Sequence, residues 1–207
     1  MNRVHALSGA VALGMASGGA YLIHNSISKT SESTLRSRLR MENHSVMESS
    51  DVNWNTVLSK YNDPNIPSDK KFSDLAGIVT KPLLKRKCSS AISSNEASLY
   101  EKAKLWCTVP KNIQQRLLDL GIHTLKMSGE GEAGDKASWE KLSGKYQEVK
   151  MDQRLKGFET ADQVDWQKLR TACSVRITKD RWDPEYDDDY LEKVTTWCSA
   201  SSKFLHE

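Results

Sequence analysis

The sequence predicts an all-α protein built from two similar helical units, each of which one disulfide can close. A set of Trp, Tyr, Leu, Cys, Ser and Ile residues occurs twice, 85 positions apart: Trp54, Tyr61, Leu84, Cys88, Ser89 and Ile92 recur as Trp139, Tyr146, Leu169, Cys173, Ser174 and Ile177. The pattern closes with Glu101-Lys102 and Trp106-Cys107, which recur 91 positions later as Glu192-Lys193 and Trp197-Cys198. The change of offset implies a six-residue insertion between Ile177 and Glu192. Apolar residues follow helical spacing throughout, and no stretch alternates as a strand does. We interpret the pattern as a tandem duplication.

The composition indicates a folded, soluble body. Charged residues make up 28% of the chain, hydrophobic residues make up 38%, and the mean hydropathy is -0.61. The hydrophobic share is too high for outright disorder. The net charge of +3 is small for 207 residues, and the one basic run, residues 81–87, has the spacing of a solvated helix face. We therefore expect no nucleic-acid partner, because such a partner requires a concentrated basic surface.

The four cysteines form two equivalent pairs. Four cysteines allow three pairings, and the duplication favours the pairing within each unit, Cys88 with Cys107 and Cys173 with Cys198, because an ancestral disulfide is copied with its unit. Each bridge would stabilise its unit by about 3 kcal/mol. The alternative is four free, buried thiols in a reducing compartment.

The N-terminal segment predicts contact with a membrane. Residues 1–5 form a short basic region, and residues 6–23, from Ala6 to Ile23, carry no charge, which predicts a transmembrane or signal helix. Cleavage after Ala20 would release the body. The short tail with Arg3 fits a signal anchor with the body outside, whereas Lys29 and the arginines at 36, 38 and 40 favour a cytoplasmic body. We expect the outside because of the paired cysteines. Residues 24–50 are Ser-rich and predict a linker.

Residues 51–127 form the first expected unit. Trp54, Leu58 and Tyr61 lie on one face of a short helix that prolines end. Further helices are expected over 72–79, over the segment that carries Leu84, Cys88 and Ile92, over the segment up to Trp106, and after Pro110. The Gly-rich residues 128–134 predict a joint, and residues 135–207 form the second unit. In that unit the Asp183-Pro184 pair predicts the start of the last helix.

No catalytic, cofactor or metal site is expected. The five histidines are scattered along the chain, and the cysteines lie 19, 66 and 25 residues apart, which does not match the close pairs of a zinc site. Clustered carboxylates mark the insertion, yet the ligand pattern of a calcium loop is missing. The insertion is still the best candidate for an interaction patch, and its members are Trp182, Asp183, Glu185, Asp187, Asp188 and Asp189. The alternative is a solvated acidic helix start, where negative charge suits the helix dipole. The paired Trp and Tyr residues are expected in the core.

The chain resembles the large paralogous families of uncharacterised proteins in haemotropic mycoplasmas, wall-less bacteria that live on red blood cells. The resemblance lies in the Gly/Ala-rich segment 6–23, the stretch from Trp54 to Tyr61, Cys88, the sequence from Trp106 to Pro110, and Trp197-Cys198. It implies anchoring in the single membrane, exposure to the host and a role in surface variation. It implies no activity.

These observations predict a membrane-anchored or exported, non-enzymatic protein. Its body would be exposed at the surface, where it would interact with host surface or serum proteins or present a variable surface. One alternative is an exported hydrolase that uses acids of the insertion. Another is a cytoplasm-facing membrane protein with reduced cysteines.

Overall fold

The computed structural model describes residues 33–159 and 163–207, so the apolar segment 6–23 lies outside the described residues. Within these two ranges the regular elements are helices, and β-pairing is limited to isolated bridges. The prediction of an all-α body is confirmed for residues 33–159 and 163–207. No helix among these residues is long and apolar enough to span a bilayer.

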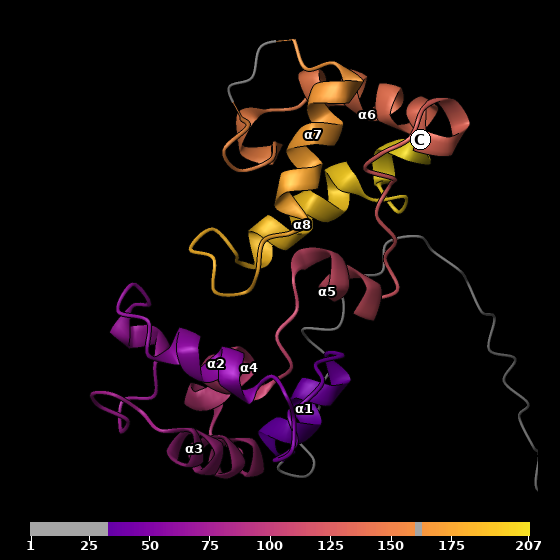
Figure 1. Ribbon diagram of the computed structural model, residues 1–207. Coiled ribbons are helices and arrows are strands. Elements are labelled where there is room, and N and C mark those ends of the chain that lie inside the picture. Colours follow the sequence, from indigo (N-terminus) through magenta and orange to yellow (C-terminus); the bar gives the residue numbers. More distant parts are fainter. Residues whose placement is uncertain (1–32, 160–162) are drawn as a thin grey trace, which may run out of the picture. The chain divides into compact units, whose positions relative to one another are not determined.

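The helices fall into two successive sets of four (Figure 1). The first set comprises α1 (Leu35–Met41), α2 (Trp54–Tyr61), α3 (Lys81–Ser93) and α4 (Tyr100–Cys107). The second comprises α5 (Ile113–Asp119), α6 (Lys136–Glu148), α7 (Trp166–Arg176) and α8 (Asp188–Cys198). Short 3-10 helices follow the same order, with η2 (Ser68–Lys70) after α2 and η5 (Met151–Gln153) after α6. The remaining 3-10 helices are η3 (Ala97–Leu99), η4 (Gly131–Gly134) and η6 (Lys203–Leu205).

The buried residues form two clusters that divide near residue 111 along the chain, apart from Trp182, whereas the sequence places the joint at residues 128–134. Leu35 and Leu39 of α1 are buried in the first core, and Ile113 and Leu117 of α5 are buried in the second. The expected linker 24–50 therefore contains a folded helix, and the Gly-rich residues 128–134 lie inside the second unit. The physical reason is that each core needs the apolar face of its first short helix. We call residues 34–110 the first repeat and residues 112–207 the second repeat.

The opening helix of each repeat begins and ends in the same way. The side chain of Thr34 accepts a hydrogen bond from Ser37 N–H at the start of α1, and Asn112 does the same for Gln115 at the start of α5. After each helix one residue takes a left-handed conformation, Asn43 with φ 59° and Gly121 with φ 73°.

Backbone pairing closes each repeat on its own opening segment. A bridge joins Val46 to Thr108 in the first repeat, and another joins Thr124 to Ser199 in the second. Thr108 and Ser199 each follow the repeated Trp-Cys pair directly. The pairing therefore ties the end of the last helix to the segment that follows the first helix.

The predicted helix over 72–79 is wrong, because this segment is irregular. Side chains hold its backbone in place of helical bonds. The Asn62 side chain donates to Val79 O and accepts from Val79 N–H, both at 2.9 Å. In the second repeat the Gln147 side chain donates to the equivalent Val164 O at 3.2 Å. Apolar residues spaced three to four positions apart are thus buried here by an irregular segment that packs on the core, not by a helix.

The predicted start of the last helix is also wrong. Asp183 accepts a hydrogen bond from Glu185 N–H in a local turn. The N-cap of α8 is Asp187, whose carboxylate accepts from Tyr190 N–H at 2.8 Å. The insertion is therefore a loop over most of its length, and this frees it to reach beyond its own repeat.

Candidate functional site

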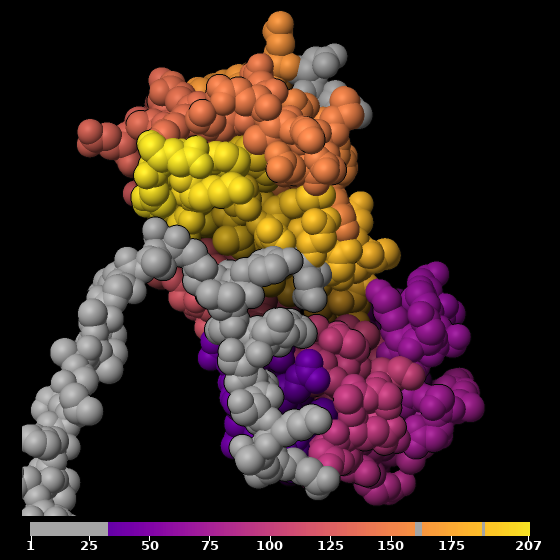
Figure 2. Space-filling view, turned by 180° about the vertical axis from the view of Figure 1, so that it is seen from behind, coloured from indigo at the N-terminus to yellow at the C-terminus, as the bar shows by residue number. Residues whose placement is uncertain are grey.

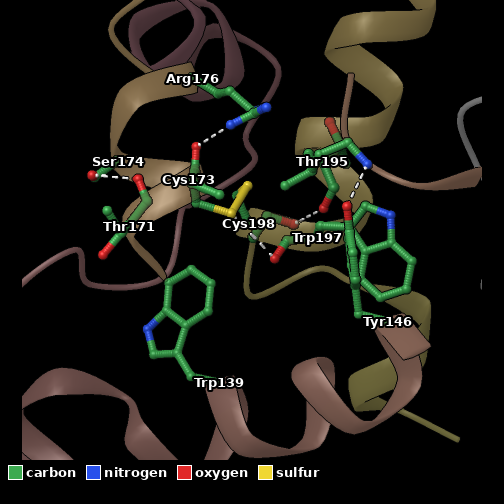
Figure 3. The surroundings of a disulfide bond; sticks show 12 residues. Trp139, Tyr146, Thr171, Cys173, Ser174, Arg176, Thr195, Trp197 and Cys198 are labelled. Carbon is green, nitrogen blue, oxygen red and sulfur yellow. Dashed lines mark hydrogen bonds between the residues drawn. A yellow bond between two sulfur atoms is a disulfide. The ribbon is translucent and has the colours of Figure 1, made fainter. Parts of the chain in front are cut away.

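Each repeat is closed by one disulfide, in the pairing that the duplication predicts. Cys88 of α3 is bonded to Cys107 of α4, with Cα atoms 5.3 Å apart. Cys173 of α7 is bonded to Cys198 of α8, with Cα atoms 5.6 Å apart. Figure 3 shows the second bridge together with Trp139 and Tyr146. Both bridges join the last two helices of a repeat, so they clamp the same part of each unit.

A tyrosine and a tryptophan pack edge to face in each repeat. The ring centroids of Tyr61 and Trp106 are 4.7 Å apart, and those of Tyr146 and Trp197 are also 4.7 Å apart. All four side chains are buried. The paired aromatic residues are therefore core, as their helical spacing predicts.

The polar atoms of the first aromatic pair hold the segment that follows α2. Trp106 Nε1 donates a hydrogen bond to Lys70 O at 2.7 Å. Phe72 N–H donates to the Tyr61 hydroxyl at 2.9 Å. Burial raises the pKa of Tyr61 above its usual value, against the effect of that hydrogen bond.

The second pair repeats both hydrogen bonds on a segment of different length. Trp197 Nε1 donates to Gln153 O at 2.8 Å, and Leu155 N–H donates to the Tyr146 hydroxyl at 3.0 Å. Burial raises the pKa of Tyr146 to about 12. The tyrosine and the residue whose N–H it accepts are 9 positions apart here and 11 apart in the first repeat. The same two hydrogen bonds therefore hold loops of different length.

Four carboxylates of the insertion form ion pairs with lysines. Asp183 lies 2.8 Å from Lys179 Nζ, and Asp187 lies 2.7 Å from Lys156 Nζ. Asp189 lies 3.3 Å from Lys156 Nζ and 3.1 Å from Lys193 Nζ, and Glu185 lies 3.8 Å from Lys179 Nζ. Asp188 is the first residue of α8.

The surroundings favour the charged form of two of these acids. Partial burial opposes ionisation of Asp183, but the hydrogen bonds from Lys179 and the Glu185 N–H, together with the charges of Lys179 and Lys60, outweigh it, so the pKa of this carboxyl lies below its usual value. Burial likewise opposes ionisation of Asp187, but the hydrogen bonds from Lys156 and the Tyr190 N–H and the charges of Lys156 and Lys193 together lower its pKa. A general acid needs a raised pKa, so neither of these two groups suits that role.

Trp182 does not share the exposed acidic surface with which the sequence groups it. Its side chain is 6% exposed and belongs to the core of the first repeat, although its residue lies in the second. The ring stacks on Trp106, with centroids 6.2 Å apart and planes at 28°. The insertion therefore carries an aromatic side chain across the boundary between the repeats.

Arg181 accompanies Trp182 across the boundary. One guanidinium nitrogen donates to Thr108 O at 2.7 Å, and the other lies 2.5 Å from Thr108 Oγ1 and 3.3 Å from Lys104 O and Val109 O. Burial lowers the pKa of Arg181 to about 9, partly offset by Tyr186 and Asp180. The side chain is still a cation at neutral pH, and it caps the carbonyl end of α4, where helical carbonyls have no partner of their own.

A shallow hollow of about 470 Å³ lies beside α1. It is lined by Arg40, Asn43, His44, Ser45, Val46 and Asp119. Burial lowers the pKa of His44 to about 3, and Arg116, Lys104, Arg181 and Lys111 lower it further. The imidazole is therefore neutral in the folded protein at any physiological pH. Cationic surroundings of this kind hold the ring in its uncharged form.

Arg116 supplies a second contact between the repeats near this hollow. Its guanidinium donates to Glu42 O at 2.7 Å and to Asn43 O at 3.0 Å. Among residues 33–159 and 163–207, no cluster of His, Cys, Asp and Glu has the arrangement of a metal site. Comparisons of this chain with known protein families, curated proteins and solved structures find no match.

Proposed function

We propose that this chain is a non-enzymatic protein, anchored to a membrane or exported, whose body lies outside the cytoplasm. There it interacts with host surface or serum proteins, or presents a variable surface to the host. The observation that carries the proposal is the pair of disulfides, one within each repeat. Disulfides persist in oxidising compartments and are rare where thiols are kept reduced. The apolar segment 6–23 and the resemblance to surface families of haemotropic mycoplasmas point the same way.

A second observation supports the presentation of a variable surface. The aromatic and cysteine positions of the core keep their residue type between the repeats, as Trp106 and Trp197 do, while several exposed positions at the same places in the fold differ. The exposed pairs that differ are Ile78 and Gln163, Ser90 and Val175, Ser68 and Met151, and Arg40 and Leu118. The same aromatic and disulfide framework thus carries different exposed residues in the two repeats. A framework of this kind tolerates further change at its surface, because surface substitutions cost little stability.

Surface proteolysis of intact cells that make the protein tests the proposal. Glu96 is exposed between α3 and α4, and Glu185 is exposed in the insertion. Both lie inside a disulfide loop, so the two pieces made by a glutamate-specific protease at each of these sites should separate only after reduction. A variant with Glu96→Gln and Glu185→Gln should lose those two cuts and serves as the matched control.

The opposite result is equally clear. If the body stays intact until the cells are lysed, while a known surface protein in the same cells is cut, the body lies inside and the proposal fails. Alkylation before lysis and reduction gives an independent check, because an extracytoplasmic body should offer no free thiol.

A further inference from the structure

The tryptophan of each Trp-Cys pair is covered by a ring from outside the repeated pattern. In the first repeat Trp182 stacks on Trp106, with centroids 6.2 Å apart and planes at 28°. In the second repeat Phe204 stacks on Trp197, with centroids 4.9 Å apart and planes at 24°. The covering ring comes from the insertion in one case and from η6 in the other. Two unrelated segments therefore fill the same role.

The oxygen acceptors beside each tryptophan are also equivalent. In the first repeat they are Lys104 O, Thr108 O, Thr108 Oγ1 and Val109 O, and all four receive Arg181. The equivalent atoms in the second repeat are Thr195 O, Ser199 O, Ser199 Oγ and Ala200 O. The internal bond from hydroxyl to helical carbonyl is the same in both, at 2.7 Å for Thr108 and 2.6 Å for Ser199.

In the second repeat residues 201–206 contact three of these acceptors, Ser199 O, Ser199 Oγ and Ala200 O. Ser202 N–H donates to Ser199 O at 3.3 Å, and Ser201 N–H donates to Ser199 Oγ at 3.2 Å. His206 Nε2 lies 3.2 Å from Ala200 O. Two backbone N–H donors, at 3.2 and 3.3 Å, thus stand where a charged guanidinium makes contacts as short as 2.5 Å in the first repeat. Charge-assisted hydrogen bonds are the stronger kind, so the second site holds the weaker occupant.

The ring that covers Trp197 is also less buried than the ring that covers Trp106. Phe204 and Leu205 are only half-buried, whereas Trp182 is 6% exposed. Figure 2 shows these residues, in yellow, at the surface beside the salmon residues of α6. Lys141 Nζ holds the segment from outside by contacts to Leu205 O at 3.1 Å and Glu207 O at 3.3 Å. The segment thus covers the core from its rim, where Phe204 and Leu205 are the side chains that pack against it.

We propose that the end of α8 is a docking socket for a protein segment that presents an arginine next to a tryptophan. The socket comprises Thr195, Trp197, Ser199 and Ala200. Residues 201–206 are a strap that fills it and that such a segment displaces. The occupied first site shows the bound geometry, because Arg181 caps the carbonyls while Trp182 covers the tryptophan ring.

The chemistry of the socket selects this partner. Carbonyl and hydroxyl oxygens at a helix end accept hydrogen bonds and favour a cation. The adjoining face of Trp197 favours a flat aromatic ring. A lysine, as a point charge, cannot reach several oxygens with one planar group as arginine does. The partner is therefore a turn that carries arginine and tryptophan side by side.

Peptide binding to the purified full-length protein tests this. The probe is a peptide with the sequence of residues 178–187, and the control peptide has Ala in place of its Arg and Trp. Because the strap is tethered beside the socket, it competes at a high effective concentration, so the wild-type chain should bind weakly. Phe204→Ala should raise the affinity at least about tenfold, the equivalent of about 1.4 kcal/mol. Val175→Ala, a change at an exposed position of α7 outside the strap, should leave it unaltered.

The indole N–H resonances in an NMR spectrum locate the binding. The Trp197 resonance should shift on addition of the Arg-Trp peptide, while that of Trp106, already covered by Trp182, should stay in place. A variant that lacks residues 203–207 repeats the test without leaving a cavity under the strap. The proposal is overturned if either folded variant fails to bind, or binds the alanine control peptide equally well. The peptide-binding test gives the same result wherever the body lies in the cell, so it is independent of the proposed function.

Discussion

Replacing Trp182 by alanine should destabilise the first repeat, although the residue belongs to the second. The side chain is 6% exposed and stacks on Trp106. A buried aromatic side chain removes about 150–250 Å² from water, which corresponds to about 4–6 kcal/mol at about 25 cal/mol per Å². The alanine that remains retains part of this, and Trp→Ala changes in cores cost about 3–5 kcal/mol. We expect Trp182→Ala to lower the free energy of unfolding by about 3–5 kcal/mol.

Urea unfolding with both disulfides intact measures the total loss, and amide hydrogen exchange locates it. Protection should fall first in α4, which lies beside the lost ring, and α8 should retain its protection. Trp166→Ala is the matched control, because Trp166 lies in the same repeat but is only half-buried. It should cost about 1 kcal/mol.

A milder variant sharpens the test. The indole N–H of Trp182 is buried and has no hydrogen-bond partner among the described residues. Trp182→Phe keeps an aromatic ring and removes this unpaired group, so it should cost clearly less than Trp182→Ala. The reasoning is refuted if Trp182→Ala costs no more than Trp166→Ala, or if protection is lost in α8 while α4 keeps it.

Three further predictions concern the two buried tyrosines, the first disulfide and His44. Tyr61→Phe and Tyr146→Phe should each cost about 1–3 kcal/mol in urea unfolding, because each leaves a buried N–H without its acceptor; a cost at only one position would contradict a shared role. Serine at both Cys88 and Cys107 should lower the free energy of unfolding by about 3 kcal/mol, given the 19-residue separation, and an unchanged urea midpoint would contradict this. The pKa of His44 is about 3 in the folded protein against 6.5 ordinarily, so the unfolded chain takes up the proton first and stability falls as pH drops from about 6.5 towards 3; His44→Gln should remove that slope, and an unchanged slope would show that another group causes it.

The class of the fold and the cysteine pairing could be predicted from the sequence because they rest on scarce residues. Cysteine and tryptophan recur in one register, and their partners fall on helix faces. The same logic placed the aromatic residues in the core. Side chains that must be buried leave a periodic signal, so this part of the structure is visible in the sequence.

The repeat boundary was missed because the signal at α1 and α5 is weak. Leu35 of α1 corresponds to Ile113 of α5, and Leu39 corresponds to Leu117. These pairs lie 78 positions apart, which differs from the offset of the main pattern. Asn43 and Gly121 perform the same left-handed turn with different residues. Structural equivalence persists here where residue identity does not.

The sequence also could not predict that the Trp182 side chain is buried in the core of the first repeat. Its neighbours are acidic and exposed, which groups it with a surface patch, while its ring is buried in the other repeat. Sequence periodicity reports that a residue is apolar, and it does not report which core receives it. The helix start expected at Asp183-Pro184 lies instead at Asp187, because the residues before it form a turn.

Mass spectrometry of the native protein, digested without reduction after alkylation of free thiols, tests the central claim most directly. Two disulfide-clamped repeats predict two linked species, one joining Cys88 to Cys107 and one joining Cys173 to Cys198, with no alkylated cysteine. Four alkylated cysteines, or peptides that link one repeat to the other, would contradict the account.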